Sequence, residues 1–214
     1  MPTADLLRAI YDRMLSRFGP QHWWPAQTPL EVMVGAILTQ NTSWKNVELA
    51  LDNLKRAGVL SLASLVEMPT ALLAEYIRPA GYYNVKAARL HNLLRFIAGR
   101  HEDDLHAFLS QPLPQLREQL LSIKGIGRET ADSILLYGAG LPIFVVDAYT
   151  HRILTRHQVI DEDYDYDAIQ DLFMDNLECD AQIYNEYHAL LVRIGNLYCK
   201  KTHPACAACP LEGL

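Results

Sequence analysis

The sequence predicts an all-α protein, and three observations lead to that expectation. Residues 4–18 carry apolar side chains at spacings of three and four, the period of an amphipathic helix, which then stops at Gly19-Pro20. Thr28-Pro29-Leu30-Glu31 is a complete capping box with proline at the first helical position, so a helix is expected from Pro29 to Leu38. No segment shows sustained period-two alternation between hairpin turns, so no sheet is expected.

The elements after residue 38 follow the same helical spacing. Polar residues 39–42 break the helix, and Val47, Ala50, Leu51 and Leu54 mark the next one. Proline-containing turns then separate helices expected at residues 62–66, 70–77, 85–98 and near 105–109. The last helices are expected near 116–121, 129–137, 149–157, 166–176 and 181–197, and no internal repeat is found.

Composition sets the broad class. The 214 residues are 50% apolar and 21% charged, enough for a buried core in one domain or two small ones. The N-terminus lacks the basic start and apolar core of a signal peptide, and apolar stretches such as 32–38 are far too short to span a bilayer. We therefore expect a cytoplasmic protein with no membrane partner. We also expect it to be a monomer.

The net charge of -6 argues at first against a nucleic-acid partner, because backbone binding relies on Lys and Arg. Residues 161–186 alone hold ten acids and no Lys or Arg, which leaves 19 bases against 15 acids elsewhere. A basic face opposite an acidic one is compatible with that distribution.

One stretch carries the strongest functional pattern. Gly125 and Gly127 lie one residue apart between two helical runs, which predicts a helix-hairpin-helix whose turn requires glycine. Such a turn presents backbone N–H groups that suit a phosphate without selecting a base. Asp147 follows at the end of an apolar run, after Gly140-Leu141-Pro142 and before another helix.

This combination of hairpin, Gly/Pro-rich loop and aspartate resembles the endonuclease III superfamily of DNA glycosylases, over most of the chain. The resemblance implies two helical domains with an active cleft between them. Residues 22–134 would form a six-helix barrel that includes the hairpin at about 116–137. Residues 1–21 together with 135–214 would form the second domain, which ends in a cysteine loop at 199–214.

The resemblance also assigns chemistry. Asp147 would be the catalytic carboxylate that stabilises positive charge on the sugar, or it would only cap the following helix. Bifunctional members carry a lysine after the Gly-Arg pair, and here Glu129 follows Gly127-Arg128. A monofunctional glycosylase without AP lyase activity is therefore expected, with Glu129 either in the base pocket or a solvated acid of the first helical turn.

DNA contacts are expected from the hairpin and from two flanking segments. Gln40 matches the glutamine that fills the gap left by the flipped nucleotide, or it is a polar residue at a helix end. Lys86 is expected to add a phosphate contact, unless it lies on a solvated helix start. The DNA-binding set is Gln40, Lys86, Lys124, Gly125, Gly127 and Arg128.

Three tryptophans are candidates for the base pocket. Trp23 and Trp24 lie in a predicted loop, and Trp44 opens the helix after Gln40; aromatic walls stack on bases and favour cationic alkylated purines. The alternative for the first two is plain packing. The loop at 23–25, residues 38–42 and residues 78–87 resemble the 3-methyladenine DNA glycosylase III branch more closely than endonuclease III itself.

Three of the four cysteines crowd the C-terminal loop. Cys199, Cys206 and Cys209 form C-x6-C-x2-C, three quarters of the family motif for a [4Fe-4S] cluster with Cys₄ ligation. The fourth cysteine is expected at position 215, beyond the given chain. The cluster is therefore expected in a longer chain, and it is otherwise absent, incomplete or completed by another ligand.

The pattern as a whole favours an enzyme of DNA base-excision repair. It would flip out a damaged, alkylated base such as 3-methyladenine from double-stranded DNA and hydrolyse its N-glycosidic bond. The alternatives are a glycosylase/AP lyase for another lesion or mismatch, and a non-catalytic DNA-binding protein that uses the hairpin alone.

Overall fold

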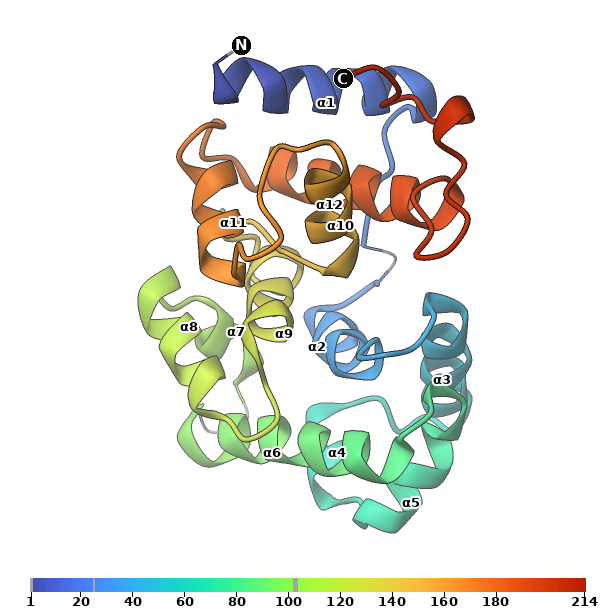
Figure 1. Ribbon diagram of the computed structural model, residues 1–214. Coiled ribbons are helices and arrows are strands. Elements are labelled where there is room, and N and C mark those ends of the chain that lie inside the picture. Colours follow the sequence, from blue (N-terminus) through green and yellow to red (C-terminus); the bar gives the residue numbers. More distant parts are fainter. Residues whose placement is uncertain (1, 25, 102–103) are drawn as a thin grey trace. The chain divides into compact units, whose positions relative to one another are not determined.

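The computed structural model describes residues 2–24, 26–101 and 104–214. Those residues form helices and connecting loops without a strand, which confirms the predicted all-α class. The chain divides into two compact units, one made of residues 1–25 and 142–214 and the other of residues 26–141. Both are drawn in Figure 1 with the helices labelled in chain order.

The unit of residues 26–141 is built around a helix buried along its length. Helix α2 (Pro29–Leu38) starts where the capping box predicts, because Thr28 Oγ1 accepts the N–H of Glu31 at 3.2 Å. The Glu31 carboxylate reaches back to the Gln27 N–H at 3.0 Å and pairs with Lys55 at 2.9 Å. Residues 30–38 are all buried, so α2 forms the core of this unit.

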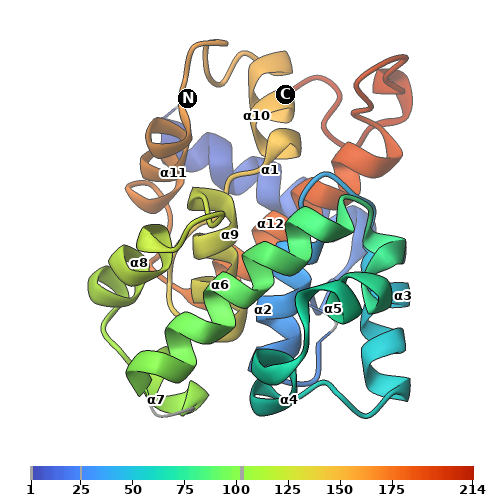
Figure 2. The same cartoon turned by 90° about the horizontal axis from the view of Figure 1, so that it is seen from below.

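Helices pack around α2 on several sides. After α3 (Trp44–Arg56) come the short α4 (Leu62–Glu67) and α5 (Thr70–Tyr76), the 3₁₀ turn η1 (Arg78–Ala80), and the long α6 (Tyr83–His101). Helix α6 contacts both α2 and α5, and Figure 2 shows it running diagonally beside them. The short α7 (Leu105–Leu109) then leads to α8 (Leu113–Ser122).

The last part of this unit is a helix that changes its winding. Helix α9 (Arg128–Ser133) continues directly into the π-helical turn η2 (Ile134–Gly138), where the Ala139 N–H bonds to the Ile134 carbonyl. Helical spacing predicted one continuous helix over 129–137. A π turn accommodates an extra residue without ending the helix, which an apolar pattern alone does not reveal.

The other unit brings the two ends of the chain together around an aromatic core. Helix α1 (Thr3–Phe18) packs on α12 (Ala181–Leu197), and the Tyr187 hydroxyl of α12 donates to the Leu7 carbonyl at 2.9 Å. Phe144 stacks on Phe173 of α11 (Tyr166–Met174), with ring centroids 3.8 Å apart. Helix α10 (Ala148–Arg156) also packs on α12, and η3 (Cys206–Ala208) follows in the C-terminal loop.

Aspartate side chains define where several helices begin. Asp104, Asp147, Asp165 and Asp180 each accept backbone N–H bonds at the start of α7, α10, α11 and α12. These caps supply acceptors for N–H groups that have no partner within the helix. They explain why the predicted starts of these four helices lie within one residue of those in the structure.

Candidate active site

The hairpin joins α8 to α9 through residues 123–127, and its two glycines differ in their need for glycine. Gly125 has φ +100°, and a Cβ there would lie 2.4 Å from Cγ of Arg89. Gly127 is extended, with φ -97°, and a Cβ there would meet no protein atom within 4 Å. The expectation that only glycine fits the turn therefore holds for Gly125, whereas Gly127 leaves open space at the start of α9.

A buried ion pair fixes the two hairpin helices to each other. Arg117 of α8 donates from Nε to Asp132 Oδ1 at 2.8 Å and from a terminal nitrogen to Oδ2 at 3.1 Å. Asp132 of α9 is fully buried. The bidentate geometry fixes both distance and orientation, so the turn between the helices is held on a rigid base.

Gln40 lies against this hairpin. Its Nε2 donates to Thr130 Oγ1 at 2.9 Å, and its Oε1 accepts a short hydrogen bond from the Arg89 guanidinium. The stem of Arg89 packs over Gly125. The structure thus brings Gln40, Arg89 and the hairpin together, and Arg89 is a member of this group that was not among the predicted DNA-binding residues.

Lys86 requires a correction. Its side chain is buried, with 1% exposure, and its ammonium donates to the carbonyls of Leu38 at 2.8 Å and Ala80 at 2.7 Å. A group held in this way does not reach a phosphate, so the expected DNA contact is wrong. Lys86 instead ties the C-terminal end of α2 to the end of η1. Burial, and then the charge of Arg89, lower the pKa of Lys86 to about 8.

The other hairpin candidates are exposed to solvent. Lys124 lies on the turn, and Arg128 and Glu129 occupy the first turn of α9. The Glu129 carbonyl accepts a hydrogen bond from Ser133 at 2.7 Å, within the helix. Lys124, Gly125 and Arg89 also line a hollow of about 440 Å³ against the first turns of α6. This face therefore offers cations beside a concave surface.

Asp147 caps α10 and keeps one oxygen out of the cap. Oδ1 accepts the Thr150 N–H at 2.7 Å and the Thr150 hydroxyl at 2.9 Å, while Oδ2 lies 3.7 Å from Nε2 of His188 on α12. The side chains of Asp147 and His188 are 11% and 8% exposed. Burial raises the pKa of Asp147, but the contacts with His188 and Thr150 outweigh it and hold that pKa below its usual value.

His188 is a residue of this site that the sequence reading missed. It is a lone histidine in the apolar run of α12, and such a residue is usually part of a core. The available signal was its spacing from Gly195, seven residues later on the same face of the helix.

The tryptophans are half-buried. The rings of Trp23 and Trp24 lie edge to face, with centroids 6.0 Å apart, in the loop after α1. They belong to the same unit as Asp147. Trp44 belongs to the other unit and donates its indole N–H to Glu48, one turn along α3, at 3.0 Å.

The C-terminal loop is held by two arginines of α10. Arg152 donates to the Cys199 carbonyl at 2.8 Å, and Arg156 donates to Cys199 Sγ at 3.3 Å and to the carbonyls of Lys200 and Lys201. Burial, followed by the neighbouring thiols of Cys199 and Cys206, raises the pKa of Cys209.

These thiols do not by themselves fit a [4Fe-4S] cluster. Cys₄ ligation needs one thiolate more than the three in this loop. In the ranges 2–24, 26–101 and 104–214, no group of three or more His, Cys, Asp or Glu side chains is arranged to hold a metal ion.

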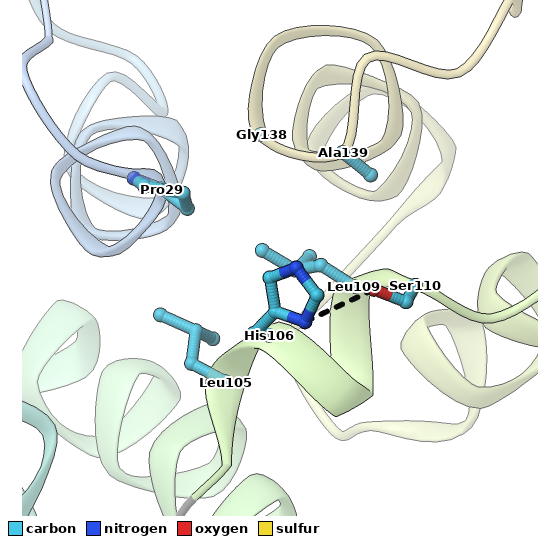
Figure 3. A pocket seen from close by; sticks show the side chains of 7 residues that line it. All are labelled: Pro29, Leu105, His106, Leu109, Ser110, Gly138 and Ala139. Carbon is cyan, nitrogen blue, oxygen red and sulfur yellow. Dashed lines mark hydrogen bonds between the residues drawn. The ribbon is translucent and has the colours of Figure 1, made fainter.

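One apolar pocket lies apart from all these candidates. It has a volume of about 370 Å³ and is lined by the first residue of α2, by α7 and by the end of η2. Figure 3 shows His106 and Ser110 hydrogen-bonded to each other at its rim. None of the predicted site residues lines it.

The described helices include none that is long and apolar enough to cross a membrane.

Comparison with known proteins gives consistent matches over most of the chain. Residues 34–179 match the family model described as HhH-GPD superfamily base excision DNA repair protein. A Methanocaldococcus jannaschii protein, named as a DNA repair glycosylase of unproven activity, is 47% identical over 209 residues, which cover 97% of this chain and 94% of that protein.

Two solved structures show the same fold. The H. pylori 3-methyladenine DNA glycosylase MagIII, bound to 1,N6-ethenoadenine, is 31% identical with a TM-score of 0.77, over 91% of this chain and 97% of that one. An endonuclease III–DNA covalent intermediate is 22% identical with a TM-score of 0.84, over 99% and 94%.

Proposed function

Because the chain belongs to the HhH-GPD superfamily of base excision DNA repair proteins, we propose that it is a monofunctional DNA glycosylase for alkylated purines. The observation that carries this proposal is the environment of Asp147. Its carboxylate is nearly buried, favoured in the ionised form, and has Oδ2 outside the helix cap.

The reaction requires this kind of carboxylate. As the bond between C1′ and the base nitrogen breaks, its electron pair leaves with the base and positive charge develops on the sugar. A fixed negative charge beside the sugar stabilises that state. Water then forms the new bond to C1′ and loses a proton, for which the carboxylate is the acceptor. The products are the free base and an abasic site.

The absence of strand cleavage in this proposal rests on Glu129. A lyase step needs an amine to attack C1′, and a carboxylate at this position does not supply one. Lys86 is buried and bound to two carbonyls, so it is not an alternative amine. Lys124 is exposed on the hairpin, where a phosphate contact is the expected use.

We assign the binding of duplex DNA to the hairpin. Gly127 leaves room for a phosphate where a side chain would project, and Lys124 and Arg128 supply charge beside it. Gln40, held beside the turn by Arg89 and Thr130, is placed to fill the gap left by a flipped nucleotide. The hairpin and Gln40 would then act as one rigid element.

An alkylated purine is the substrate class that we assign. Its positive charge makes it a good leaving group, so a stacking pocket can replace a strong general acid. The paired indoles of Trp23 and Trp24 supply such a surface. The 31% identity to a 3-methyladenine glycosylase supports the same class.

The test is base release from duplex DNA containing alkylated bases, with strand breaks scored separately before and after alkali. We expect free 3-methyladenine, and breaks only after alkali. Asp147→Asn should abolish release while DNA binding is retained. The matched control is Asp165→Asn, because Asp165 caps α11 through the same kind of bond to a backbone N–H. Equal release from both variants would refute the role of Asp147.

Two other outcomes would select the alternatives. Strand breaks that appear without alkali would support the alternative of a glycosylase with AP lyase activity. DNA binding without any base release would support the alternative of a non-catalytic DNA-binding protein.

We propose further that the cysteine loop carries a cluster only when a fourth thiolate joins Cys199, Cys206 and Cys209. Iron and acid-labile sulfide should appear in a chain lengthened by a cysteine at position 215 and be absent from residues 1–214 alone. Iron-free protein in both cases would remove the cluster from this proposal.

A further inference from the structure

The two oxygens of the Asp147 carboxylate have different surroundings. Oδ1 is occupied by the Thr150 N–H and the Thr150 hydroxyl, at 2.7 and 2.9 Å. Oδ2 faces His188, whose Nε2 lies 3.7 Å away. Because the cap occupies Oδ1, the oxygen left for chemistry is the one beside His188.

A close helix contact brings His188 to this position. A Cβ on Gly195 of α12 would lie 2.1 Å from Cδ1 of Tyr149 in the first turn of α10, so only glycine permits this approach. The Tyr149 hydroxyl also donates to Asn196 Oδ1 at 2.7 Å. His188 precedes Gly195 by two helical turns, so it lies on the α12 face that packs against the start of α10.

The other polar and charged groups of the packed helices have different partners. His151 faces the Glu162 carbonyl, Arg152 donates to the Cys199 carbonyl, Arg193 donates to Gln21, and the Tyr166 hydroxyl accepts the Val146 N–H. Of these groups, His188 is the one whose ring nitrogen lies beside Asp147 Oδ2, at 3.7 Å.

We propose that His188 is a positioning residue that orients Asp147 Oδ2 and keeps the carboxylate ionised during base release. The inference rests on the proposed function, because it concerns the same carboxylate. A protonated Asp147 carries no negative charge to stabilise the sugar cation, so the fraction of ionised Asp147 limits the rate at low pH. Burial alone would raise the pKa of Asp147, and the His188 contact is the largest influence that lowers it.

The test compares His188→Gln with wild type in single-turnover base release across pH. Glutamine keeps an N–H donor and does not titrate. We expect the acidic limb of the profile to move up by about one pH unit. Release should be about tenfold slower at pH values below both Asp147 pKa values and almost unchanged near pH 8. His151→Gln is the matched control, since it removes a histidine that faces a backbone carbonyl. A His188→Gln profile that superimposes on wild type overturns the inference.

A second readout does not depend on catalysis. The pKa of the Asp147 carboxyl, followed by carbon NMR, should be higher in His188→Gln than in wild type, and an unchanged pKa refutes the role of His188. Lack of base release by wild type, in contrast, refutes the proposed function alone. If His188→Gln does not fold, the pKa of the Asp147 carboxyl in wild type is the remaining measurement, and it must lie below its ordinary value. A pKa raised above that value would overturn the inference.

Discussion

Replacing Lys86 with methionine tests whether a buried ammonium joins the ends of α2 and η1. Lys86 is 1% exposed, and its pKa is lowered from 10.5 to about 8, first by burial and then by the charge of Arg89. Between those two values the unfolded chain binds more protons than the folded one. The contribution of Lys86 to stability is therefore fully present above pH 10.5 and is lost as the pH falls through 8.

The size of the effect follows from the same two values. With one pKa unit worth about 1.4 kcal/mol, the free energy of unfolding of wild type gains about 2 kcal/mol from this residue between pH 7 and pH 9.5. Lys86→Met has no such gain, and it leaves the Leu38 and Ala80 carbonyls without their donor, at a cost of about 1–3 kcal/mol each. The destabilisation caused by Lys86→Met should therefore grow with pH.

The assay is urea unfolding of wild type and Lys86→Met at both pH values. The exposed Lys45→Met serves as the control, because Lys45 lies on the outer face of α3 and should show no pH-dependent difference. A difference in unfolding free energy between wild type and Lys86→Met that stays constant, or that shrinks as the pH rises, would refute the reasoning.

Two further predictions concern the hairpin. Gly125→Ala forces a side chain at φ +100° against Arg89, so duplex affinity measured by fluorescence anisotropy should fall about tenfold. The extended Gly127 should accept alanine without loss of thermal stability. Equal melting temperatures for the two variants would contradict this account. Arg117→Met removes the bidentate partner of the buried Asp132 carboxylate and should cost about 3–5 kcal/mol in urea unfolding. A loss below about 1 kcal/mol would mean that the pair does not hold the helices together.

Helix positions were predictable from the sequence because their determinants are local. The capping box at Thr28 and the aspartate caps of later helices act within four residues of the chain. The spacing of apolar residues is local as well. The π turn at 134–138 was not predictable, since the hydrogen bond from the Ala139 N–H that defines it leaves no mark in the apolar pattern.

The site was less predictable because its contacts join distant parts of the chain. Lys86 follows a tyrosine-rich turn, as a phosphate ligand would, yet it is bound by carbonyls, one of them 48 residues away. His188 approaches Asp147 only because Gly195 lets two helices meet. The sequence indicates which residue types are present, whereas their partners depend on how the helices pack. The roles of Gln40, Asp147 and the tryptophans stay predictions.

The π turn at Ile134–Gly138 also bears on how this gene can change. The turn holds one residue more than an α-helical turn, so losing a codon there could relax it to ordinary α winding, without rotating the hairpin helix that precedes it. It stands nine residues before Asp147 in the chain. A one-residue deletion that would shift a helical face elsewhere can therefore be absorbed at this point.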